Sequence, residues 1–478
     1  MAMQTPDSST QAVERELTSY QRNLVDTCFE EGNFDSAIAL LEELRLPGVK
    51  PCPAHVRNAV YIALYPPPSA EDEHDASRLD VIPASPSKFV ARHQRSSCTP
   101  TPAASQAAQR LLRAYARTNT PGAVLRALPN YGLSDLPGLS DTVSPHSIGD
   151  DDNESEINTF SRRVKDATSC WEMLREGFVK RDGSSPAGST AGHRRSRRGH
   201  RNGLSDDEDE SSEMPAAVGE QAWPLLECLL LLFEKDEAAV SAKGQPPYSP
   251  LLLSQLPPNR SASGSRWNVG APLDVVFFSL QHRGRFSLGV RLLALLVNLT
   301  ATVFVDLPMI TNAVCTRTMG LTSLQLSKMF ALLPSTEAVM HFKVSLCILC
   351  LAATPSNGGR KTRPKPQARA GPRPTPRQRG IATDDTAAAR DGSATAPTAT
   401  EPEPIRRTFF APPTSDVLEL LRSPLGSRAS DADITRHLKF QLFSAYGALQ
   451  AALARGAQDP AWREALEGGD LAAAVALA

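Results

Sequence analysis

The stretch from Ser287 to Ala353 is the longest apolar region of the chain, and it constrains the fold more than any other feature. Residues 292–305 carry no charge, but this run is too short for a membrane-spanning helix, because the hydrocarbon core needs roughly 20 residues of helix. Pro308 interrupts the run, and Asn312, Arg317 and Lys328 recur beyond it. This pattern is typical of helices that are buried over most of their surface. We therefore expect the stretch to form the core of a helical domain that does not lie in a membrane.

The end of this stretch contains the signals of a separate helix. Ser335 or Thr336 can cap free amide groups at the start, and Glu337 suits the positive first turn. Thr354-Pro355 is expected to end the helix.

Composition limits how much of the chain can pack. There are 39 prolines among the 478 residues, and several tracts are rich in Ser, Pro and Gly, so we expect about half to two thirds of the chain to be ordered. Apolar residues recur mostly at helical spacing, and few alternating strand patterns occur. The predicted fold class is all-α, an irregular helical-repeat-like domain of αα-hairpin or solenoid-like type that is interrupted by long disordered linkers.

The same composition and spacing predict the order of the segments along the chain. The segments are an N-terminal αα-hairpin region at 9–64, a disordered linker at 65–102, helical segments at 103–180, a disordered basic and acidic linker at 181–216, a central apolar helical core at 217–354 with an internal linker at 243–268, a disordered basic Pro-rich tract at 355–412, and C-terminal helices at 413–478.

The N-terminal region contains the clearest local motif. A first helix with apolar positions from Val13 to Phe29 is followed by a Gly32 turn, a second helix containing Ala37, and an exit at Gly48-Val-Lys-Pro51. This arrangement resembles one hairpin of a pentatricopeptide repeat and, more loosely, of a tetratricopeptide repeat. The resemblance covers about 35 residues, whereas solenoids need about three units for stability. It implies RNA or peptide binding if further copies exist, and a single αα-hairpin is the alternative.

Two longer helices are expected between the linkers. The first covers Thr159 to Lys180, where Phe160, Trp171 and Phe178 belong to one predicted buried stripe. The second covers Trp223 to Val240, with Pro224 tolerated in its first turn.

Cysteine usage and the N-terminus indicate the compartment. The eight cysteines have no framework spacing, and no apolar signal segment begins the chain, which favours a reducing intracellular compartment. Asn298-Leu299-Thr300 fits the N-glycosylation pattern, but we discount it because it falls in the apolar helix.

A pair of basic clusters indicates nuclear entry. A flexible spacer separates the first cluster from the second, and the arrangement resembles a bipartite nuclear localisation signal. The residues are Lys180, Arg181, Arg194, Arg195, Arg197 and Arg198. The predicted location is the nucleus, with the cytoplasm as the alternative, and the alternative for the clusters themselves is a polyampholytic loop without a receptor.

Two serines are candidate phosphorylation sites. Ser85 begins Ser-Pro-Ser-Lys, which resembles a cyclin-dependent kinase site, and Ser-Pro pairs recur at Ser249 and Ser423. Ser205 precedes an acidic run, Asp206 to Glu210, of the kind acidophilic kinases favour.

The tract 360–379 is a candidate nucleic-acid contact. It is basic, rich in proline and free of acids, and such segments stay solvated but can neutralise phosphates. Its first basic residues are Arg360, Lys361, Arg363 and Lys365.

No motif for catalysis or for a cofactor is found. There is no P-loop, HExxH, GxSxG or Rossmann glycine pattern. Cys347 and Cys350 have a metal-like spacing, but a zinc site needs four ligands, so we interpret them as buried thiols. The expected function is that of a non-enzymatic nuclear scaffold or adaptor that binds protein partners through a helical surface and is regulated by phosphorylation of its linkers. The alternatives are a helical-repeat protein that binds DNA or RNA through 360–379, an enzyme with an unfamiliar site, and a membrane-associated protein. No cofactor, metal or small-molecule substrate is predicted.

Overall fold

The computed structural model describes residues 14–68, 99–129, 131, 155–181, 215–258, 267–318, 320–353, 407–423, 429–453 and 457–469. These residues are mostly helical, and the strands among them form one short two-stranded sheet and one isolated bridge. The predicted all-α class is therefore confirmed.

The N-terminal helices form the first part of the fold. They are α1 (Ser19–Glu30), α2 (Phe34–Glu43) and α3 (Pro53–Leu64). Strands β1 (Arg15–Glu16) and β2 (Val49–Lys50) pair in parallel beside them. Gly32, at φ 74°, makes the turn between α1 and α2, a backbone region that glycine enters without steric cost. Ala37 is fully buried in α2, as expected of the contact position of the hairpin.

The first helix begins later than the apolar pattern indicates. Thr18 caps α1 and forms a capping box with Gln21, which fixes the helix start. Leu17 is buried although it precedes the helix, and Leu24, within the helix, is 42% exposed. The predicted position Val13 lies outside the described residues.

The next helices pack on α3 and on the long helix α10. They are α6 (Pro102–Thr118), α7 (Pro121–Leu125), α8 (Glu156–Asp166) and α9 (Cys170–Leu174). The helix predicted over Thr159 to Lys180 is divided into α8 and α9, because the chain is extended at Ala167 and Ser169. The predicted stripe is nevertheless buried, with Trp171 at 2% exposed and Phe178 half-buried.

The central apolar helical core predicted at 217–354 supplies the middle of the fold. Its elements are η3 (Glu220–Ala222), α10 (Trp223–Ala242), α11 (Pro250–Ser254), α12 (Gly270–Gln281), α13 (Phe286–Asn298), η4 (Leu299–Ala301), α14 (Leu307–Thr318), α15 (Ser323–Leu332) and α16 (Glu337–Ala353). Helices α12 and α13 approach closely at Gly289, where an added Cβ would lie 2.8 Å from the Val276 carbonyl oxygen. Any larger residue would push the two helices apart.

Two of the C-terminal helices, α17 (Thr414–Arg422) and α18 (Ala429–Ala452), pack on α16, and α19 (Pro460–Glu467) packs on α17. Leu442 and Tyr446 of α18 are buried, and Trp462 of α19 packs edge-on against Tyr446 at a centroid distance of 4.9 Å.

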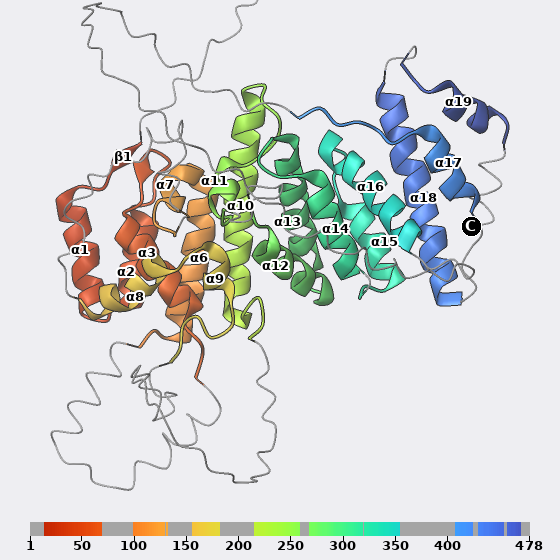
Figure 1. The fold of residues 1–478 in the computed structure, drawn as a ribbon. Coiled ribbons are helices and arrows are strands. Elements are labelled where there is room, and N and C mark those ends of the chain that lie inside the picture. Colours follow the sequence, from red (N-terminus) through yellow and green to blue (C-terminus); the bar gives the residue numbers. More distant parts are fainter. Residues whose placement is uncertain are drawn as a thin grey trace, which may run out of the picture.

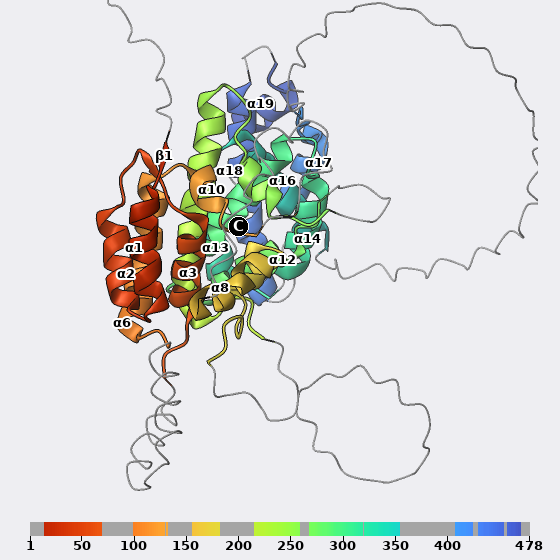
Figure 2. The ribbon, with the colours of Figure 1, turned by 90° about the vertical axis from the view of Figure 1, so that its left-hand side faces the viewer.

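The helices follow one another through space nearly in sequence order. Packed pairs lead from α1 and α2 through α3, α6 and α10 to α12, α13 and α14, and then to α16 and α18. Figure 1 shows this order as a colour gradient along the molecule, with α1 at one end and α18 at the other. Viewed from the N-terminal end, α1 and α2 lie in front and to one side of the later helices, so the arrangement is not straight (Figure 2). We call this arrangement the helical stack.

Two predicted linkers contain packed segments. Within 243–268, helix α11 buries Leu252 and Leu253, and Trp267 is 4% exposed. The sequence did not predict this five-residue helix, because it is too short to give a periodic signal and its flanks have a low-complexity composition. Within 355–412, residues 407–412 lie in extended form on the central core, where the Arg407 amide donates to the Ala301 carbonyl. Residues 69–98, 182–214, 259–266 and 354–406 lie outside the described residues.

Candidate functional site

The structure describes only the first basic cluster among the residues singled out from the sequence. Lys180 and Arg181 end the described segment 155–181. The other predicted site residues lie outside the described residues: Ser85, Arg194, Arg195, Arg197, Arg198, Ser205, Arg360, Lys361, Arg363 and Lys365.

The folded body anchors the backbone next to Lys180. Val179 is 7% exposed, and the Arg163 guanidinium lies 5.6 Å from the centroid of the Phe178 ring. Lys180 itself is exposed. Lys180 of the first cluster is thus presented at the surface directly after an anchored segment, whereas Arg181 is half-buried.

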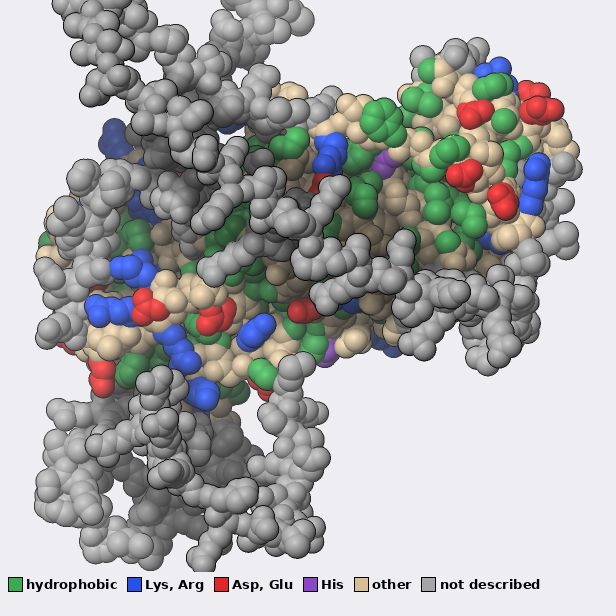
Figure 3. Space-filling view, viewed as in Figure 1, with side chains coloured by type: hydrophobic (Ala, Val, Ile, Leu, Met, Phe, Trp, Pro, Cys, Tyr) green, Lys and Arg blue, Asp and Glu red, His purple; other side chains and the backbone are tan. Residues whose placement is uncertain are grey.

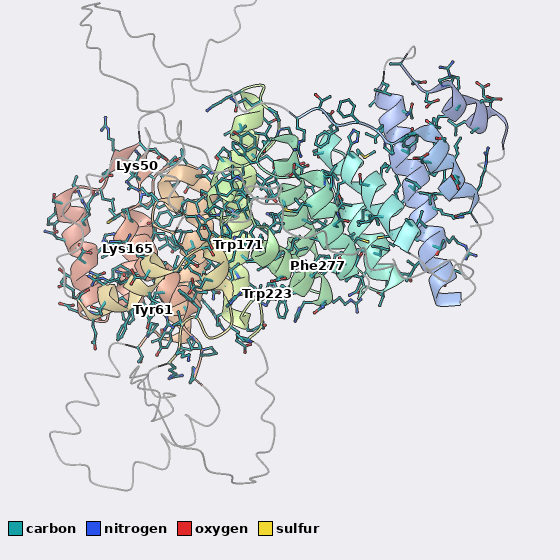
Figure 4. The ribbon with its side chains drawn as sticks, viewed as in Figure 1. Lys50, Tyr61, Lys165, Trp171, Trp223 and Phe277 are labelled. Carbon is teal, nitrogen blue, oxygen red and sulfur yellow. The ribbon has the colours of Figure 1, made fainter. Side chains whose placement is uncertain are left out.

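The surface around α8 carries charges of both signs. Arg162, Arg163 and Lys165 of α8 are exposed, and acidic residues such as Asp166 and Glu172 lie among them. Figure 3 shows basic and acidic side chains interspersed over the N-terminal helices on the face in view. Lys165 projects from this region, whereas Trp171, Trp223 and Phe277 lie where the N-terminal helices meet the central ones (Figure 4).

Three lysines, of which Lys235 is half-buried and Lys343 and Lys439 are buried, each bind the end of another helix. Lys235 of α10 donates to the carbonyls of Ala116, Arg117 and Asn119 at the end of α6, at 2.7 to 3.2 Å. Lys343 of α16 donates to the Leu333 carbonyl after α15 at 3.1 Å, and Lys439 of α18 donates to the carbonyls of Leu421 and Ser423 after α17. A helix ends with carbonyls that lack partners and carry partial negative charge, so an ammonium group satisfies both needs. Burial lowers the pKa of all three lysines.

The surroundings of Lys343 and Lys439 are alike in sequence and in structure. His341-Phe342-Lys343-Val344-Ser345-Leu346 matches His437-Leu438-Lys439-Phe440-Gln441-Leu442 in its His-apolar-Lys-apolar-polar-Leu order. Each lysine lies on the long second helix of a pair and binds the end of the short first helix. Burial lowers the pKa of both histidines, and each ring lies near a phenylalanine ring, Phe409 for His341 and Phe330 for His437. Sequence reasoning missed this pattern, although the repeated six-residue order was visible.

A chain of polar groups connects α10, α13 and α16. Arg291 binds Glu234 through two bonds of 2.7 Å. One turn away, the Asn298 amide donates to Glu237 at 3.0 Å, and the Thr336 hydroxyl donates to the Asn298 oxygen at 2.8 Å. Asn298 is 3% exposed, so it is not available for glycosylation in the folded chain. Thr336 thus fixes the start of α16 to α13.

Glu237 is the acid in this chain of groups whose pKa is shifted. Burial raises its pKa to about 7, against the hydrogen bond from Asn298, and the nearby Glu234 and Asp236 add to the rise. Its second carboxylate oxygen is buried and makes no hydrogen bond to any residue that the structure describes. At neutral pH the group therefore exchanges between charged and neutral forms inside the stack.

One histidine has an acidic partner, as in many catalytic sites. His55 Nε2 lies 2.8 Å from the Asp26 carboxylate, but the residue is 1% exposed. Its other ring nitrogen, Nδ1, has no hydrogen-bond partner in the described part of the chain. A relay that activates a nucleophile needs that second bond, so the pair joins α1 to α3 and does not form a triad.

The cysteines of the central core are buried thiols. Cys347 is fully buried, and Cys350 is 8% exposed and lies 3.4 Å from Cys315, measured between sulfurs. Burial raises the pKa of Cys347 well above its usual range and that of Cys350 to about 12. Among the described residues no group of three or more His, Cys, Asp or Glu side chains could hold a metal ion.

One of the Ser-Pro pairs is part of the core. The Ser249 hydroxyl donates to Asp236 at 2.6 Å and accepts from the Leu252 amide, which caps α11. Ser249 is completely buried, so a kinase could reach it only after local unfolding.

The comparisons with known proteins add no relative. No helix in the described ranges combines the length and the apolar character that a membrane crossing requires. No protein-family model matches the chain, and no curated protein or solved structure matches it significantly.

Proposed function

We propose that this protein is a non-enzymatic scaffold or adaptor subunit of a nuclear multi-protein complex. The observation that carries the proposal is the use of the buried and half-buried polar groups. Lys235, Lys343 and Lys439 each hold one helix end to another helix, and Glu234, Arg291 and Asn298 join α10 to its neighbours. Polar groups that bind helix ends and one another in this way stabilise a long helical surface. At those positions they do not form a cluster that could catalyse a reaction.

We further propose that the surface for partners is that of an irregular helical-repeat stack. The support is the pair of matching units, α15 with α16 and α17 with α18, in which Lys343 and Lys439 play the same part. Repeat proteins bind partners along the continuous surface that stacked units create. Phosphorylation at Ser85 and Ser205 is the proposed regulation, because added phosphate charge creates or blocks contacts with basic partners.

Nuclear entry is the part of the proposal that can be tested first. The tagged full-length protein is imaged in cells beside a variant with alanine in place of Arg194, Arg195, Arg197 and Arg198. A matched control removes four exposed arginines from the folded body instead: Arg110, Arg117, Arg162 and Arg283. We expect the wild-type protein and the control in the nucleus, and the first variant in the cytoplasm. A cytoplasmic or organellar wild-type protein would contradict the proposal.

The scaffold role needs a second measurement. The full-length protein is purified from nuclear extract, and the co-purifying proteins are identified against a background purification. We expect a constant set of partners that survives nuclease treatment. Partners that disappear with nuclease, together with salt-dependent binding of DNA or RNA that requires 360–379, would favour the nucleic-acid alternative.

A further inference from the structure

Two thiols from different helices meet in the central core. Cys315 lies in the last turn of α14, and Cys350 lies in the last turn of α16. Their sulfurs are 3.4 Å apart, and the side chains are 6% and 8% exposed. The S–S bond of a disulfide is about 2.05 Å long, so a movement of about 1.4 Å, which side-chain rotation can supply, would join them.

We propose that Cys315 and Cys350 form an intramolecular disulfide when the protein meets hydrogen peroxide, and that this bond locks α14 to α16. The pair is a modification site for a small oxidant. Cys347 lies one turn before Cys350 on the same helix but is fully buried, and it is the natural comparison.

The reaction balances with peroxide as the only oxidant. One cysteine thiol loses its proton, and the resulting thiolate attacks a peroxide oxygen. The O–O bond breaks, the sulfur becomes a sulfenic acid, and the departing hydroxide takes up the released proton and leaves as water. The sulfur of the second cysteine then attacks the sulfenic sulfur, the S–O bond breaks, and a second water leaves with the remaining thiol proton. In total two thiols lose two electrons and two protons, and one peroxide becomes two waters.

The site favours this product over deeper oxidation. The second thiol is already in contact with the first, so the sulfenic acid has a partner before another peroxide arrives. The reaction is slow near neutral pH, because burial holds the proton on Cys350, and it accelerates as pH rises.

The bond would link the C-terminal ends of α14 and α16, where the chain leaves each helix. Helix α14 is followed at once by the turn into α15, and α16 is the last described element before residue 407. A link between the two helix ends would prevent them from separating in local unfolding.

The test uses the full-length protein and peptide mapping. The protein is treated with hydrogen peroxide at pH 7 and at pH 8.5, free thiols are alkylated, and non-reduced peptides are analysed by mass spectrometry. We expect a linked peptide pair containing Cys315 and Cys350, formed faster at pH 8.5. We also expect the oxidised protein to melt at a higher temperature than the reduced protein, and dithiothreitol to reverse the shift.

Single variants assign the bond. Cys347→Ala should keep both the linked pair and the shift in melting temperature, whereas Cys315→Ala and Cys350→Ala should lose both. Alanine fills part of the buried space, and a thermal melt of each reduced variant establishes that it is folded. A link that involves Cys347, sulfinic acid in place of the disulfide, or complete alkylation of Cys315 and Cys350 after oxidation would each overturn the proposal.

Discussion

At the scale of single residues, buried and half-buried charged and polar side chains join the helices. Lys343 reaches the end of α15, Asn298 bridges Glu237 and Thr336, and Arg291 binds Glu234. Each group is costly to bury alone, and each bond offsets that cost only while both partners are in place. The sequence predicted Thr336 at the start of the last core helix. It could not predict the partner of Thr336, because Asn298 lies 38 positions away.

Glu237 makes the stability of the protein depend on pH. Its pKa is raised from 4.5 to about 7, so between these values the folded protein binds more protons than the unfolded chain. The free energy of unfolding therefore falls as pH rises through this window, by about 3 kcal/mol at most. We expect Glu237→Gln to melt at a higher temperature than the wild type at pH 8 and to differ little at pH 5, as measured by thermal unfolding.

Glu234→Gln is the matched control, one turn away on the same helix. It removes the charge that binds Arg291 through two short bonds, so we expect it to lower the melting temperature at pH 8. An increase in both variants would show that general charge removal, and not the burial of Glu237, is responsible.

Short elements contribute more to the packing of the protein than their length indicates. Gln255 follows α11 and is 2% exposed. Its amide group donates to the Pro129 carbonyl at 2.8 Å and accepts from the Cys170 amide at 3.0 Å, and its own carbonyl accepts from the Trp171 ring at 2.7 Å. One residue within the predicted linker 243–268 thus holds three segments together. Composition indicated a linker there because the segment is short and its partners are distant in sequence.

We expect Gln255→Leu to destabilise the protein by about 2 to 6 kcal/mol. Leucine is close to glutamine in size, but it would leave the Pro129 carbonyl and the Cys170 amide buried without partners, at about 1 to 3 kcal/mol each. Chemical denaturation followed by circular dichroism measures the change. Gln245→Leu, at a half-buried position before α11, is the control and should change stability by less than about 0.5 kcal/mol. Equal effects of the two variants would contradict the role of Gln255.

At the scale of the whole molecule, the chain builds one continuous hydrophobic core. The apolar stretch Ser287 to Ala353 was predicted as the centre of a helical domain, and its helices do lie in the middle of the stack (Figure 1). The order of packing was not predictable, because periodicity shows that a helix has a buried face but not which helix covers it. The same limit applies to the candidate site, since the contact between Cys315 and Cys350 depends on how α14 meets α16.

The C-terminal helices return to the core after a long interval of sequence. Arg407 binds Asp306 and the Val305 carbonyl, and the Phe409 ring stacks on His341 at a centroid distance of 5.0 Å. Helix α18 then covers α16 with Leu442 and Tyr446, which are 0% and 1% exposed. All of these contacts are non-covalent, and none of them involves residues 354–406.

We therefore expect the folded protein to stay in one piece after the chain is cut between α16 and Arg407. A specific protease site is inserted near residue 385, the full-length protein is cleaved after folding, and size-exclusion chromatography is run at moderate salt. The two fragments should elute together, because separation would expose the apolar faces of α16 and α18 to water. Leu442→Asp buries a charge in the interface and should release the C-terminal fragment, whereas Ser444→Asp, exposed on the same helix, should not. Separate elution of the wild-type fragments would mean that the C-terminal helices are held mainly by the chain connection, and that the packing of α18 on α16 contributes little to the stability of the fold.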